Sequence, residues 1–76
     1  MSSEPACLDV RKFSCPIPLM RAQRRLRTMQ VGERLLVLTT DPDARADFKA
    51  YCEGGTSRIL DIVERAGQID FLLERV

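Results

Sequence analysis

The sequence predicts an α/β fold: a two-layer α+β sandwich with the order β-α-β-α-β-β, in which two helices cover one face of a four-stranded mixed sheet. Two proline-containing turns, at Pro16-Ile17-Pro18 and Asp41-Pro42-Asp43, each precede apolar residues at helical spacing. A continuous apolar run at residues 35–38 lies between the two helical segments and is typical of a buried strand. Two strand-like segments near the C-terminus, separated by a short turn, predict an antiparallel hairpin.

Length and composition indicate one small domain over residues 1–76, with residues 1–6 as a disordered lead. A hydrophobic share of 45% and a charged share of 30% are ordinary for a folded globular protein. The sequence shows neither an apolar N-terminal segment nor an apolar run long enough to span a membrane. We therefore expect a cytoplasmic protein that does not engage a membrane.

The first half of the chain predicts a parallel pair of strands joined by a helix. Residues 7–11 alternate weakly, which places Leu8 and Val10 on one face of a short strand. The helix is expected from about Pro16 to Met29, followed by Gly32 as the residue that ends it. Residues 33–40 form the next strand, and the strand–helix–strand order implies a crossover connection.

The second half predicts a helix followed by the hairpin. The helix starts at Asp41-Pro42-Asp43 and ends at Gly54-Gly55. Its expected buried face comprises Ala44, Phe48, Tyr51 and Cys52. The hairpin strands are residues 57–65 and 69–76, and their many charges fit a sheet face that is open to solvent.

Cys15 is the leading candidate for a reactive residue. It lies at, or one residue before, the start of the first helix, where the helix dipole favours an anion and lowers a thiol pKa. Pro16 and Pro18 lack an N–H, so we expect the Ile17 amide to be the donor that faces the sulfur. We interpret Cys15 as a partly activated sulfur on a stiff backbone. The alternative is a small buried apolar residue, the usual role of a free cysteine.

Other features limit the chemistry. Three cysteines cannot form a complete internal disulfide framework, and the chain has no histidine for a Cys–His pair or a metal site. The sequence also contains no C-x-x-C and no glycine-rich phosphate loop, so no metal and no bound cofactor are expected. We expect Cys7 and Cys52 to be structural. A thiolate without a histidine base suits sulfur-to-sulfur exchange.

Charge is distributed unevenly along the chain. Residues 1–32 carry a net charge of +4, and residues 33–76 carry −3. Four arginines of the first helix have no acidic residue between Asp9 and Glu33 to pair with. They form either a solvated helix face or a docking surface for a negatively charged partner. The candidate partner-binding residues are Lys12, Arg21, Arg24 and Arg25.

Several motifs together resemble the TusA/SirA-like sulfur-carrier family over nearly the whole chain, from about Cys7 to Val76. They are Leu8-Asp9-x-Arg11, the C-P-x-P element Cys15-Pro16-Ile17-Pro18, Gly32-Glu33 before an apolar strand, and Asp41-Pro42. The resemblance implies the same β-α-β-α-β-β fold and a role in sulfur trafficking. By position, Cys15 would accept sulfane sulfur as a transient persulfide and pass it to an acceptor protein. The donor implied is a cysteine desulfurase or a rhodanese-like protein.

The chain departs from the family pattern at two places. Lys12 stands where members commonly have glycine, and Thr56-Ser57 stands where many have a Gly-His pair. These departures leave the persulfide chemistry in place. They leave the pathway open among tRNA thiolation, sulfur oxidation, molybdenum cofactor synthesis and selenium metabolism.

Two other functions compete with the sulfur carrier. One is a non-catalytic module that binds RNA or a regulatory protein through the basic helix. Direct nucleic-acid binding is not expected, because the aromatic residues are few and Phe48, Tyr51 and Phe71 are assigned to the core. The other is a thiol–disulfide switch between Cys15 and Cys52 or Cys7. A relay protein must expose Cys15 to its partners, so we expect a monomer. If the protein is catalytic, we expect it to be a sulfurtransferase.

Overall fold

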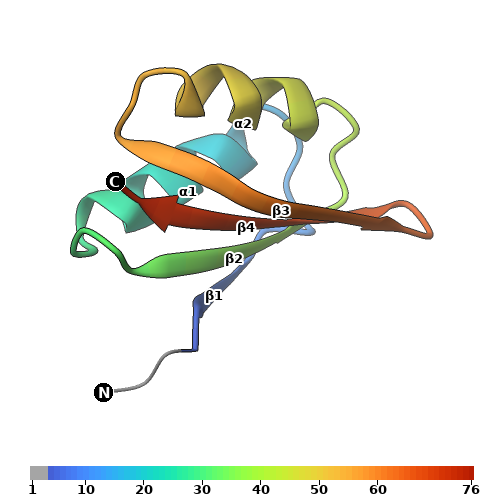
Figure 1. The fold of residues 1–76 in the computed structure, drawn as a ribbon. Coiled ribbons are helices and arrows are strands. Elements are labelled where there is room, and N and C mark those ends of the chain that lie inside the picture. Colours follow the sequence, from blue (N-terminus) through green and yellow to red (C-terminus); the bar gives the residue numbers. More distant parts are fainter. Residues whose placement is uncertain (1–3) are drawn as a thin grey trace.

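A computed structural model of the chain describes residues 4–76. Figure 1 shows both helices on one face of a single sheet, which confirms the predicted α/β sandwich. The order of the elements is also as predicted: β1 (Ala6–Asp9), α1 (Ile17–Arg27), β2 (Arg34–Thr39), α2 (Ala44–Cys52), β3 (Ser57–Arg65) and β4 (Gln68–Arg75). Within residues 4–76, no helix has the length and apolar character needed to cross a membrane.

The sheet topology brings two loops to one edge of the sheet. The strand order is β1-β2-β4-β3, with β1 parallel to β2 and the remaining pairs antiparallel. The Val10 amide extends the parallel pairing by donating to the Leu38 carbonyl at 2.9 Å. Thr40 Oγ1 donates to the Arg11 carbonyl at 2.8 Å, which ties the loop after β2 to the loop after β1. The carboxyl ends of parallel strands commonly hold functional sites.

The core lies between the helices and the sheet. Along β2, Leu35 and Val37 are buried, whereas Leu36 and Leu38 are only half-buried on the helix-free face. The rings of Phe48 from α2 and Phe71 from β4 stack with centroids 4.6 Å apart. The predicted buried face of α2 is confirmed: two of its residues are fully buried, and the other two pack against the core. They are Ala44, Phe48, Tyr51 and Cys52.

The predicted element boundaries differ from the structure at a few residues. Ala6 pairs with Leu35 and begins β1, so the expectation that Ala6 belongs to a disordered lead is wrong. The first three residues of that lead lie outside the described chain. Helix α1 ends at Arg27 rather than Met29, because the Thr28 and Met29 amides bond to carbonyls three residues back and tighten the last turn.

Candidate functional site

Cys15 lies in the tight turn between β1 and α1. Pro16 is the N-cap of α1, so Cys15 precedes the cap by one residue and its side chain is exposed. The Ile17 amide donates to the Ser14 carbonyl at 2.9 Å and closes this turn. The expectation that the Ile17 amide faces the sulfur is therefore wrong, since the local turn uses that donor. The predicted position of Cys15 at the start of the helix is confirmed.

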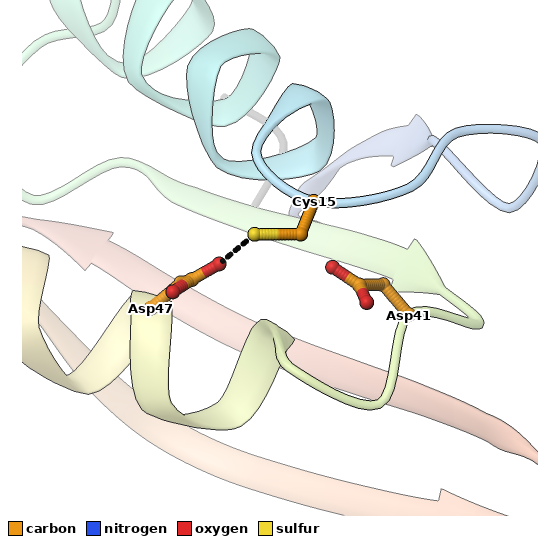
Figure 2. Close-up of side chains that lie close together, drawn as sticks. All are labelled: Cys15, Asp41 and Asp47. Carbon is orange, nitrogen blue, oxygen red and sulfur yellow. Dashed lines mark hydrogen bonds between the residues drawn. The ribbon is translucent and has the colours of Figure 1, made fainter.

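The hydrogen-bond partner of Cys15 comes from the other helix. Cys15 Sγ donates to Asp47 Oδ2 at 3.0 Å, across a separation of 32 residues (Figure 2). Asp47 lies in the first turn of α2, where the positive end of the helix dipole favours a carboxylate. The contact joins the starts of both helices at the edge of the sheet where β1 and β2 end.

Asp41 completes the cluster from the loop after β2. Its side chain is buried, and its amide donates to Thr39 Oγ1 at 3.1 Å. Asp41 Oδ1 accepts a hydrogen bond from the Asp43 amide at 3.1 Å, which fixes the carboxylate at the start of α2. Figure 2 shows this carboxylate turned toward Cys15. Cys15 Sγ and one carboxylate oxygen from each of Asp41 and Asp47 lie within 4.8 Å of one another.

The carboxylates determine the ionisation of the thiol. The hydrogen bond to Asp47 is the main cause that raises the pKa of Cys15 from 9.0 to about 11, followed by desolvation and the negative charges of Asp47, Asp41 and Asp43. The expected lowering of this pKa by the helix dipole is therefore wrong. A hydrogen-bonded carboxylate beside the sulfur stabilises the thiol, and its negative charge opposes the thiolate.

Comparison with known proteins places the chain in a family. A family model described as sulfurtransferase TusA matches residues 6–75. The chain belongs to the TusA family. A Neisseria meningitidis serogroup A protein, whose name marks it as a candidate sulfur carrier, is 39% identical over 74 residues and covers 97% of both chains. The sulfur carrier protein TusA of Allochromatium vinosum is 32% identical over 68 residues and covers 90% of both chains.

The other two cysteines of this TusA-family protein differ from Cys15 in their surroundings. None of the three forms a disulfide bond in residues 4–76. Cys52 is half-buried against the core, and burial raises its pKa, in keeping with a structural role. Cys7 is exposed and lies on the helix-free face of β1, so it does not pack in the core as a structural cysteine would.

The basic cluster of this TusA-family protein, defined as Lys12, Arg21, Arg24 and Arg25, is exposed. The guanidinium of Arg21 lies over the Phe13 ring, 4.3 Å from its centroid. Lys12 lines a neighbouring hollow, and no member of the cluster takes part in an ion pair within residues 4–76. The three arginines share one shallow hollow, whose lining is Leu8, Arg21, Arg24, Arg25 and Thr28.

The sequence pattern selects Cys15 as the candidate residue and does not select Asp41 and Asp47, which the structure places beside it. Asp41 was assigned only to the start of the second helix, and Asp47 was not singled out. A usable signal existed, because Cys15 follows the first of two parallel strands and Asp41 follows the second. Such loops meet at one edge of a sheet, so acidic residues after the second strand were candidates for contact with Cys15.

Proposed function

We propose that this protein is a sulfur carrier that holds sulfane sulfur as a persulfide on Cys15. A donor protein, such as a cysteine desulfurase or a rhodanese-like protein, would load the sulfur, and an acceptor protein would remove it. The observation that carries the proposal is an exposed Cys15 thiol hydrogen-bonded to the Asp47 carboxylate at 3.0 Å. Membership of the TusA family, which includes the sulfur carrier protein TusA of Allochromatium vinosum, supports the same function.

Loading requires a proton acceptor beside the sulfur. Cys15 Sγ attacks the outer sulfur of the donor persulfide, and its proton passes to Asp47. A new S–S bond forms on Cys15 while the S–S bond of the donor breaks, and the donor thiolate leaves. The chain contains no histidine, the residue that commonly acts as general base for a cysteine. Asp47 can take this role because it already accepts the hydrogen bond of the Cys15 thiol.

Unloading reverses the proton movement. An acceptor thiolate attacks the outer sulfur of the Cys15 persulfide, the S–S bond on Cys15 breaks, and Cys15 leaves as a thiolate. Cys15 Sγ then takes up a proton from solvent, and the thiol again donates its hydrogen bond to Asp47. The raised pKa of Cys15 favours this final step, because the thiol form is the stable resting state.

The basic cluster supports docking of acidic partner surfaces. Its arginines are exposed, share one hollow and lack ion-pair partners within the described chain. Such a surface increases the rate of association with acidic proteins and exchanges partners readily. We infer a monomer, since its sulfur must be reached in turn by a donor and an acceptor.

The alternative, an RNA-binding module, receives little support from the aromatic residues. Phe48 and Phe71 stack on each other in the core, and Phe13 lies beneath the guanidinium of Arg21. Stacking of unpaired bases needs accessible aromatic faces.

Intact mass spectrometry after incubation with a cysteine desulfurase and cysteine tests the proposal. We expect wild type and Cys52→Ser to gain one sulfur atom, and Cys15→Ser to gain none. A matched control with Cys7→Ser should load like wild type. Stoichiometric loading of Cys15→Ser, or no loading of wild type from either a desulfurase or a rhodanese, would overturn it.

A further inference from the structure

Asp41 has a carboxylate oxygen without a partner. The residue is only 6% exposed, and its Oδ1 is occupied by the Asp43 amide. Its Oδ2 is buried and has no hydrogen-bond partner within residues 4–76. Burying an acceptor without a donor is unfavourable, and buried polar atoms in folded proteins are nearly always satisfied. The carboxylate faces Cys15, so its missing partner belongs in the space between Cys15, Asp41 and Asp47 (Figure 2).

The dimensions of this space suit a metal ion. The three ligand atoms lie within 4.8 Å of one another, and one pair, Cys15 Sγ and Asp47 Oδ2, is 3.0 Å apart. Tetrahedral zinc with ordinary bond lengths separates a sulfur and an oxygen ligand by about 3.5 Å. Small side-chain rotations of Cys15, which is exposed, and Asp47, which is half-buried, would reach this spacing. Asp41 would keep its bond to the Asp43 amide.

The local charge also favours a cation. Asp41, Asp43 and Asp47 lie within seven residues of one another at the start of α2. None of the three takes part in an ion pair within the described part of the chain. A divalent ion would neutralise carboxylates that no lysine or arginine neutralises.

We propose that Cys15, Asp41 and Asp47 form a three-ligand site for a zinc ion. One thiolate and two carboxylates match the borderline softness of zinc, whereas magnesium and calcium avoid sulfur. Binding forms a Zn–S bond, breaks the S–H bond of Cys15 and releases its proton to solvent. A fourth coordination position remains for water or a partner side chain, as in zinc sites that are not purely structural.

Zinc at this site excludes sulfur from Cys15. The same Sγ atom cannot both coordinate zinc and carry the outer sulfur in the resting geometry. Zinc would therefore hold the thiol unreactive until the metal is removed. This consequence rests on the proposed function, whereas zinc binding itself does not.

Isothermal titration of the chelator-treated full chain with zinc chloride tests the site. We expect one zinc per chain with a dissociation constant of about micromolar or tighter. The variants Cys15→Ser, Asp41→Asn and Asp47→Asn should each weaken binding about tenfold or more. Asp41→Asn keeps an oxygen that can accept from the Asp43 amide, so the start of α2 should stay folded. The matched control for the thiol is Cys52→Ser, which should bind like wild type. The matched control for the carboxylates is Asp43→Asn, which removes a nearby charge but no ligand and should weaken binding less than Asp41→Asn or Asp47→Asn.

Cobalt substitution reports directly on the sulfur ligand. A thiolate-to-cobalt charge-transfer band should appear in wild type and Cys52→Ser and be absent in Cys15→Ser. No zinc binding by wild type, equal binding by Cys15→Ser, or equal loss in Asp43→Asn and Asp41→Asn would overturn the proposal.

Mass spectrometry of sulfur loading with and without zinc separates the two proposals. We expect equimolar zinc to suppress loading of wild type and excess chelator to restore it. A chain that loads sulfur and binds no zinc would remove the metal site and leave the carrier function intact. A chain that binds zinc and never loads sulfur, with or without chelator, would leave the metal site intact and contradict the carrier function.

Discussion

Cys15 Sγ donates a hydrogen bond of 3.0 Å to Asp47 Oδ2, which joins the start of α1 to the start of α2. The two residues meet because β1 and β2 are parallel and their following loops share one edge of the sheet. The thiol is thereby exposed to partners and held in its protonated form by a neighbouring carboxylate.

The first prediction concerns the pH dependence of Cys15. Because its pKa is raised to about 11, alkylation by iodoacetamide should be slow near neutral pH and increase up to about pH 11. Asp47→Asn removes the main cause, so its alkylation profile should shift toward lower pH. The measurement is the alkylation rate against pH in chelator-containing buffer, on a Cys7→Ser, Cys52→Ser background. If the profile is the same with Asp47 and with Asp47→Asn, Asp47 is not the main cause of the raised Cys15 pKa.

The same shift affects stability with a definite sign. The folded chain holds the Cys15 proton more tightly than the unfolded chain, whose thiol has the ordinary pKa of 9.0. The contribution is therefore present below pH 9.0 and is lost as the pH rises toward about 11. The urea midpoint of wild type should therefore fall between pH 9.0 and about 11, and this part of the fall should be absent in Cys15→Ser.

A second prediction concerns Asp9, at the end of β1. The hydrogen bonds from the Arg11 side chain, at 2.9 and 2.8 Å, are the main cause that lowers the pKa of Asp9 from 3.8 to about 2. Stability from this pair is present above pH 3.8 and is lost as the pH falls toward about 2. In an NMR titration, Arg11→Ala should return the Asp9 midpoint toward 3.8, while Lys12→Ala should change it less. A wild-type midpoint near 3.8 would show that the pair does not persist in solution.

A third prediction concerns the end of α1. Arg75 Nη1 donates to the Leu26 carbonyl at 2.6 Å and the Met29 carbonyl at 3.1 Å, so β4 satisfies carbonyls at the C-terminus of the helix. Arg75→Ala should lower the free energy of unfolding by about 1.5–3 kcal/mol, as for hydrogen bonds from a charged donor. The ion pair between the exposed Arg58 and the half-buried Glu74 is the control, and Arg58→Ala should lower the free energy of unfolding by less than about 1 kcal/mol. Equal urea midpoints for the two variants would refute the capping role.

A fourth prediction concerns the basic cluster. The double variant Arg24→Glu, Arg25→Glu should slow sulfur loading from a protein donor about tenfold or more at low salt, because electrostatic steering is lost. Loading from inorganic polysulfide should be unchanged, since a small donor needs no docking surface. Quenching the reactions at successive times and measuring the intact mass of the protein gives the loading rate from each donor. An equal effect on both donors would point to damage at Cys15 instead of docking.

Local sequence patterns predicted much of the fold. The strand at residues 57–65 has the predicted bounds, because the turn at Ala66-Gly67 interrupts an otherwise continuous β pattern. Helix α2 begins one residue after Asp41-Pro42-Asp43, and its buried face follows from helical spacing. These features depend on residues close together in the chain.

The chemistry of the site could not be predicted from local patterns. The prediction of a lowered Cys15 pKa counted only its own helix, whereas the controlling Asp47 is 32 residues away. The helix-start pattern predicts that the Ile17 amide faces the sulfur, whereas the tight turn directs this amide to the Ser14 carbonyl. Asp41 becomes part of the site only through the parallel pairing of β1 and β2.

The most direct test of the carrier function follows one sulfur atom through both half-reactions. The protein is loaded with heavy-isotope sulfane sulfur, separated from the donor and mixed with an acceptor thiol, and peptide mass spectrometry follows both products. We predict that the heavy sulfur is found first on Cys15 and then on the acceptor, leaving unmodified Cys15. Heavy sulfur that resides on Cys7 or Cys52, or that stays on Cys15 in the presence of every acceptor thiol, would contradict the account.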